Sequence, residues 1–146
     1  MSKKILGTVK ELYISTSQEP SRILKSELQI DENGVIGDKF YGKDSLRSIL
    51  ISSTDAYTLA KNTNIDMAYG VLGENILIEG TIRDLNLGDF FYIGEVSFQI
   101  AQNCTICKGL SKIDAKLPKL LKDDRGIFIQ AITNGSIKNG DELYIL

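Results

Sequence analysis

Short stretches of β-forming residues, separated by glycines and turn residues, recur along almost the whole chain. The first runs from Ile5 to Ile14, and the continuous apolar run Ile49–Ile51 is typical of a buried strand. Similar stretches occupy residues 26–30, 75–79, 90–93, 96–101, 126–132 and 142–146. This succession of short strands and turns predicts a mainly β fold, a barrel or a sandwich with a few helices.

Only two regions carry a helical pattern. The polar cluster Ser52–Asp55 can cap a helix of about two to three turns, with Ala56, Leu59 and Ala60 on one face. The segment Ser111–Leu121 can also be helical, and Pro118 suits the first turn of a second short helix. No linker or break in composition divides the chain, so residues 1–146 are expected to form a single domain.

The composition is that of a globular protein, with 42% hydrophobic and 25% charged residues. No apolar run is long enough to cross a bilayer, so we expect no membrane association. The formal net charge is −2, whereas nucleic-acid-binding domains usually carry a strong basic excess. Nucleic acid is therefore not an expected partner.

The chain contains no histidine, which excludes Ser-His-Asp and Cys-His catalysis as well as His-ligated zinc or haem. Two cysteines are too few for a secreted disulfide scaffold in a chain of 146 residues. The segment Met1–Gly7 has basic residues but no hydrophobic region follows it. We therefore expect a cytoplasmic protein with reduced thiols.

The two cysteines form one motif, Cys104-Thr105-Ile106-Cys107. A C-x-x-C motif can be a redox pair, half of a zinc site or two buried, inert thiols. No zinc is expected, because the chain has no further cysteine or histidine. A functional thiol is favoured by Lys108 and the helix predicted just beyond it, since both would lower the pKa of the Cys107 thiol.

Lysines recur at helical spacing after this motif, with apolar residues between them. They are Lys108, Lys112, Lys116 and Lys119. This stripe is either a solvated helix face or a rim that attracts an anionic ligand, such as a phosphorylated one, to the thiol.

A glycine-rich segment, Gly70–Ile76, leads into one of the predicted strands. It is either turn chemistry or a small-ligand contact, since glycines allow close approach of the backbone. In the second case, the Glu74 carboxylate and the Asn75 amide would contact the ligand.

Taken in order, these segments resemble the MOSC domain, named after the C-terminal domain of molybdenum cofactor sulfurase. The resemblance covers almost the whole chain from Gly7 onward. The matching residues are Gly34–Asp38, Arg47 ahead of Ile49–Ile51, Gly73–Ile76, Leu87–Asp89, Ile93–Gly94, Cys107–Leu110, Arg125–Ile127 and Gly140–Leu143.

The resemblance implies a mixed β-barrel with peripheral helices and a site built around Cys107. In the family, the matching thiol is proposed to carry sulfur as a persulfide received from a pyridoxal-phosphate cysteine desulfurase. In relatives that bind molybdenum cofactor, it ligates the metal as a thiolate, a soft ligand. Family members often carry Arg-His after the Gly-Asp, where this chain has Lys39 and Phe40, so any role of that histidine is absent here.

The resulting hypothesis is a stand-alone MOSC-like protein in sulfur transfer or molybdenum-cofactor-linked metabolism. Cys107 is the predicted nucleophile, persulfide carrier or molybdenum ligand, and Cys104 is a possible resolving thiol. Arg47, Lys108 and Lys112 are predicted to attract a phosphate or pterin, and Glu74 and Asn75 to line the pocket. The predicted partner is a cysteine desulfurase or a molybdenum-cofactor enzyme.

Two alternatives from other functional classes remain open. One is a non-catalytic module that binds a small anion or a protein, and the other is a C-x-x-C dithiol redox protein. Neither the oligomeric state nor an enzymatic activity follows from the sequence.

Overall fold

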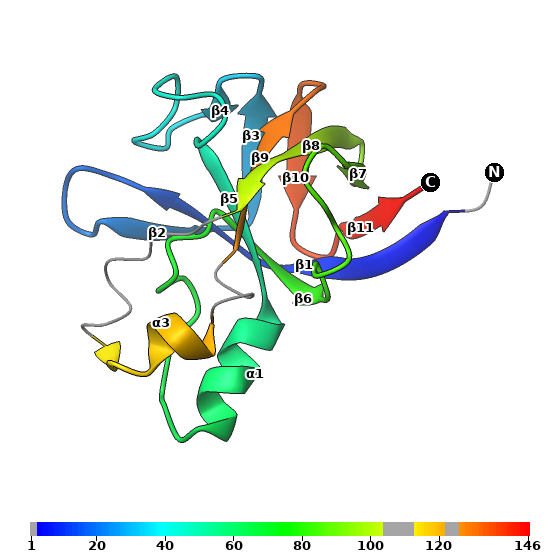
Figure 1. Ribbon diagram of the computed structural model, residues 1–146. Coiled ribbons are helices and arrows are strands. Elements are labelled where there is room, and N and C mark those ends of the chain that lie inside the picture. The colour runs from blue at the N-terminus through cyan, green and yellow to red at the C-terminus, as the bar shows by residue number, and fades with distance from the viewer. Residues whose placement is uncertain (1–2, 104–112, 122–125) are drawn as a thin grey trace.

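The computed structural model describes residues 3–103, 113–121 and 126–146, and strands dominate this part of the chain (Figure 1). The strands are β1 Lys4–Ser15, β2 Arg22–Lys25, β3 Glu27–Asp31, β4 Gly34–Val35, β5 Ile49–Ser53, β6 Ile76–Gly80, β7 Phe90–Ile93, β8 Val96–Asn103, β9 Ile127–Ala131, β10 Gly135–Lys138 and β11 Glu142–Ile145. The helices are α1 Thr54–Asn62 and α3 Leu117–Leu120.

Seven strands close into a barrel. The large sheet has the order β11-β7-β8-β9-β5-β6-β1-β2, and a further pairing of β11 with β1 joins its ends. The pair β5–β6 is parallel and the other pairs of this sheet are antiparallel, so the barrel is mixed. The mainly β fold and the mixed barrel predicted from the sequence are confirmed.

The barrel interior is filled by the apolar side chains that alternate along its strands. Phe91 and Phe98 are fully buried, and their rings stack with centroids 5.4 Å apart. Each such side chain contributes about 1.5–3 kcal/mol by leaving water. A small second sheet, β10-β3-β4, adds Leu28, Ile30 and Ile137 to the same core.

The two helices cover one side of the barrel and form a second apolar cluster with the outer face of β6 (Figure 1). Helix α1 begins after Ser53, whose hydroxyl accepts a hydrogen bond from Asp55 N, as the polar cluster predicted. In α3, Pro118 lies in the first turn, also as predicted. None of the helices described by the structure is long and apolar enough to cross a membrane.

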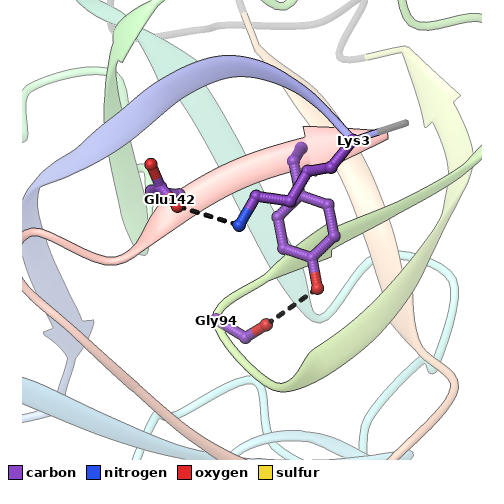
Figure 2. A network of polar contacts seen from close by, with 4 residues as sticks. Lys3, Gly94 and Glu142 are labelled. Carbon is purple, nitrogen blue, oxygen red and sulfur yellow. Dashed lines mark hydrogen bonds and ion pairs between the residues drawn. The ribbon is translucent and has the colours of Figure 1, made fainter. Parts of the chain in front are cut away.

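The closing contact between β1 and β11 carries a polar network near the start of the chain. Figure 2 shows Lys3 directed toward Glu142, and the two side chains form an ion pair with Nζ and Oε1 3.0 Å apart. The Lys3 ammonium also lies 4.6 Å from the centre of the Tyr144 ring. Because both charged side chains are exposed, the pair adds little to the free energy of unfolding.

Strands β2, β4 and β10 were not predicted from the sequence. Strand β2 has an exposed Leu24 between basic residues, and β10 buries only Ile137. These short strands lack the apolar alternation on which a sequence pattern depends.

The backbones of β1 and β6 approach each other closely at Gly80, which has φ +145°. A Cβ at this position would overlap the Leu6 carbonyl oxygen and lie 2.7 Å from Gly7 Cα. Only glycine fits here without displacing β1.

We therefore expect Gly80→Ala to lower the free energy of unfolding by at least about 2 kcal/mol more than Gly42→Ala. Gly42 also has a positive φ, +73°, but a Cβ there would meet nothing within 4 Å. Gly42→Ala therefore serves as the control for a substitution at positive φ without an overlap. Urea unfolding measures both variants, and equal losses would contradict the close approach of β1 and β6.

Candidate functional site

The cysteine motif Cys104–Cys107, together with Lys108 and Lys112, lies outside the described residues. Its neighbourhood is nevertheless defined by the strand that leads to it. Strand β8 ends at Asn103, directly before Cys104, and Asn103 is paired with Ile127 at the start of β9. The predicted roles of both thiols stay predictions.

The end of β8 lies in one row with the start of β6. Ile76 of β6 is paired with Ile51 of β5, Ile51 with Ile127, and Ile127 with Asn103. Three strand spacings separate the ends of this row, which is about 14 Å. The barrel therefore brings the segment before Cys104 and the segment containing Glu74 and Asn75 to the same level.

Arg47 precedes β5 and lies against β9, one of the strands that this row crosses. Its guanidinium is 5.4 Å from the centre of the Phe128 ring, and Phe128 of β9 is paired with Gln102 near the end of β8. Arg47 is exposed, and its side chain has no hydrogen bond or ion pair to any described residue. In the part of the chain that the structure describes, none of its five N–H donors has an acceptor, and such a fork of donors suits an anion.

Glu74 lies at the junction between the barrel and the helices, and its side chain is fully buried. One carboxylate oxygen, Oε2, accepts hydrogen bonds from Ser52 Oγ at 2.6 Å and from the Tyr57 hydroxyl at 2.5 Å. The other, Oε1, is buried and has no hydrogen-bond partner among the described residues. Glu74 therefore joins β5, α1 and the start of β6.

The Tyr57 hydroxyl stabilises this junction as both a hydrogen-bond donor and an acceptor. It donates to Glu74 and accepts a hydrogen bond from Gly70 N at 3.1 Å. Burial, followed by the nearby Glu74 carboxylate, raises the pKa of Tyr57. The phenol therefore stays protonated and can keep donating.

Asn75 uses its side chain within the protein. Its amide nitrogen donates to the Tyr13 carbonyl at 3.2 Å and to Asp38 Oδ1 at 3.1 Å, and its amide oxygen accepts from Leu50 N at 3.1 Å. Both amide hydrogens are thus engaged. Asn75 shapes the neighbourhood of the site by holding β1 and β5 together.

Asp38 is a buried residue that sequence reasoning noted only as part of a motif. Its carboxylate accepts hydrogen bonds from Ser15 N at 2.6 Å, Phe40 N at 3.0 Å and the Asn75 amide. Phe40, at the position of the family's histidine, is exposed, with the Lys39 ammonium 5.1 Å from its ring centre. The Gly-Asp signal could have identified Asp38 as the anchor of this loop.

Arg22 was missed because nothing in its sequence context distinguishes it. Its guanidinium lies 5.1 Å from the centre of the Tyr13 ring and donates to Ser15 Oγ at 2.6 Å and to the Glu74 carbonyl oxygen. Its Nε is buried without a hydrogen-bond partner among the described residues. Arg22 of β2 therefore fixes the backbone of Glu74, while Tyr57 of α1 holds its side chain.

The described residues contain no group of three or more Cys, Asp or Glu side chains that could hold a metal ion. Of the lysine stripe, Lys116 and Lys119 are exposed at α3, whereas Leu117 is buried against α1 and β6. Both interpretations of the stripe remain open.

Comparison with known proteins identifies the family. Residues 37–144, more than half of the chain, match the MOSC domain. The chain belongs to the MOSC domain family. This family is associated with the molybdenum cofactor, and a role related to that cofactor fits the chain. Among curated protein sequences, no significant match is found.

Solved structures support the same fold for this MOSC domain. YuaD from Bacillus subtilis has a TM-score of 0.80 at 18% sequence identity, with 98% of this chain and 96% of YuaD covered. YiiM from Escherichia coli has a TM-score of 0.67 at 20% identity, with 95% and 69% covered. YiiM from Geobacillus stearothermophilus has a TM-score of 0.63 at 17% identity, with 99% and 75% covered.

In this MOSC domain, we expect Tyr57→Phe to lower the free energy of unfolding by about 1–3 kcal/mol. The change removes one donor from the buried Glu74 carboxylate and leaves Gly70 N–H without its acceptor. Denaturant unfolding at neutral pH measures this loss.

Tyr69→Phe is the matched control for this prediction. The Tyr69 ring packs edge-on against Tyr57 at 4.9 Å but is partly exposed, so its change should stay within about 0.5 kcal/mol. Equal effects of the two variants would show that the Tyr57 hydroxyl does not hold the junction.

Proposed function

We propose that this MOSC protein works in sulfur transfer or molybdenum-cofactor-linked metabolism, with Cys107 as its reactive group. The carrying observation is the position of Arg47. Its exposed guanidinium lies against Phe128, beside the end of the strand that leads into the cysteine motif. The family membership and this cation, which has no ionic partner among the described residues, together favour chemistry on a negatively charged ligand near a thiolate.

In the sulfur-carrier form of the proposal, the Cys107 thiolate attacks the outer sulfur of a persulfide on a pyridoxal-phosphate cysteine desulfurase. The S–S bond of the donor breaks, and the donor cysteine leaves as a thiolate with the bonding electron pair. A new S–S bond forms on Cys107, so the transfer needs no external oxidant or reductant. Cys104 could then displace the carried sulfur as hydrosulfide, forming a disulfide with Cys107.

In the cofactor-linked form, the Cys107 thiolate is a molybdenum ligand, and Arg47, Lys108 and Lys112 hold the phosphate of the pterin. When bound, the cofactor supplies the redox chemistry of molybdenum. The one described member of this set, Arg47, fits the role because its donors have no acceptor among the described residues. The partner in this form is a molybdenum-cofactor enzyme.

Glu74 and Asn75 belong to the wall of the proposed site. Both come directly before Ile76, which lies in the same row as the end of β8, but the hydrogen bonds of Asn75 are made within the protein. We assign them the role of shaping the site. Direct contact with the ligand falls to Arg47 and to the residues of the cysteine motif.

We expect thiol labelling of the folded protein to show an inflection below about pH 8 that is lost in Cys107→Ser and kept in Cys104→Ser. An activated Cys107 should also accept sulfane sulfur from a desulfurase, measured by cyanolysis. An unreactive Cys107 would favour a non-catalytic binding module. A reversible disulfide without any bound sulfur would favour a dithiol redox protein.

We expect Arg47→Gln to slow persulfide loading at low salt, with a difference from wild type that shrinks as ionic strength rises. Lys138→Gln removes the same charge from the exposed end of β10 and serves as the control. Loading rates in a salt series measure both variants. If Arg47→Gln and Lys138→Gln behave alike, Arg47 does not steer the donor, and the observation carrying the proposal is lost.

A further inference from the structure

Strand β2 is the one member of the large sheet that lies outside the closed barrel. It pairs with the last four residues of β1 and ends the strand order. The hairpin that connects β1 and β2 projects from the side of the barrel (Figure 1). In the described part of the chain, the outer edge of β2 has no partner strand.

The hydrogen-bond pattern shows which peptide groups of β2 face outward. Thr16 N donates to Ser21 O at 2.9 Å, so Thr16 and Ser21 form a hydrogen-bonded pair. Hydrogen-bonded and non-bonded pairs alternate in an antiparallel ladder, which makes Ser15–Arg22 and Tyr13–Leu24 non-bonded pairs. Consistent with this, Tyr13 N points away from β2 and donates to Asn75 O.

The N–H and C=O groups of Arg22 and Leu24 therefore point away from β1. No described residue hydrogen-bonds to these four groups. They are two donors and two acceptors, arranged symmetrically about Ile23. An edge of this kind is a template for pairing with another strand.

The side chains beside this edge are apolar and accessible. Leu24 is 62% exposed and lies opposite Tyr13, whose ring packs against Gly70. Tyr69 and Val71, on either side of that glycine, are each 43% exposed. An added strand would therefore find an apolar surface next to backbone groups to which no described residue bonds.

We propose that β2 pairs with β2 of a second copy of this chain, in an antiparallel two-fold arrangement centred on Ile23. Arg22 then lies opposite Leu24 of the second copy, and Leu24 opposite its Arg22. All four outward groups of each strand are used in this register, giving four backbone hydrogen bonds. The inference concerns assembly and does not depend on the proposed function.

The two-fold symmetry of the outward backbone groups favours a second copy as the partner, and this register also keeps the basic side chains from lying directly opposite each other. Lys25 lies opposite Ser21, and Arg22 lies opposite an uncharged leucine, so no like charges face each other directly. A register centred on Leu24 would leave only one hydrogen-bonded pair. The outward donors and acceptors of the edge are thus self-complementary, and two-fold pairing uses this edge on both chains, which closes the assembly at two copies.

Sedimentation velocity over a concentration series tests the proposal. The wild-type chain is expected to form a concentration-dependent dimer. Leu24→Pro removes an outward N–H that makes no bond to β1, so the hairpin should persist while the dissociation constant rises at least about tenfold. A wild-type chain that stays monomeric at high concentration would overturn the proposal.

Charge substitutions at position 24 test the register and remain informative if Leu24→Pro fails to fold. Leu24→Lys faces Arg22 of the second copy and should weaken the dimer, whereas Leu24→Glu should bind more tightly than Leu24→Lys. Both differences should shrink in high salt. Leu46→Lys and Leu46→Glu change another exposed leucine and should behave alike.

Hydrogen exchange gives a second readout. The Leu24 amide should become protected as the protein concentration rises, while the Ile23 amide, bonded to β1, should be protected throughout. A dimer that forms with an unprotected Leu24 amide, or that ignores the charge at position 24, would show that another surface is used. Protection by an added unrelated strand-forming peptide, without self-association, would assign the edge to a different partner.

Discussion

The hydrogen bonds of the Asn75 side chain hold together the strands and the loop around the start of β6. The Asn75 amide connects the Tyr13 carbonyl of β1, Leu50 N of β5 and the Asp38 carboxylate. The Asn75 backbone also donates to Leu50 O and accepts from Tyr13 N. A single residue thus fixes the start of β6 between its two neighbours, where a parallel and an antiparallel pairing meet.

Two buried carboxylates, those of Asp38 and Glu74, lie next to Asn75 in the fold or the sequence, and they accept hydrogen bonds from different kinds of donor. Asp38 accepts backbone N–H groups and the Asn75 amide, which ties its loop to the barrel. Glu74 accepts hydroxyl groups from β5 and α1, which ties the helices to the same place. Because an unpaired buried charge is expensive, each bond that one carboxylate makes restricts the position of a separate element.

The sequence pattern was sufficient for the long strands and for α1, because their apolar spacing and capping residues are local signals. Strand β2 could not be predicted from apolar spacing, because Leu24 is exposed. The strand is held by its pairing with β1. The partners of Glu74 were also hidden, because Ser52 and Tyr57 precede it by 22 and 17 residues. Only the pairing of β5 with β6 brings them together.

The motifs that suggested ligand contacts therefore contain two kinds of residue: those that hold the fold together and those proposed to contact a ligand. Asn75 and Asp38 make their side-chain hydrogen bonds to other residues of the protein. These two residues therefore have a structural role in the barrel, whether or not a ligand binds. In the proposed function, contact with the ligand therefore falls to Arg47 and to the residues of the cysteine motif. Glu74 is fully buried and helps to shape the site.

Two arginines, Arg22 and Arg47, show how the surroundings of a residue separate a structural role from a proposed role in ligand binding. Arg22 stacks on Tyr13 and donates to Ser15 and Glu74, so its charge serves the junction of β2 with the barrel. Arg47 lies against the ring of Phe128 in a cation–π contact. Such a contact at an exposed site contributes about 0.5–1 kcal/mol and does not use the N–H donors of the guanidinium. At about 0.1 M salt its field extends about 10 Å, comparable with the row from β6 to β8. In the proposed function, Arg47 would thus supply a local positive charge for an anion although the formal net charge of the chain is −2.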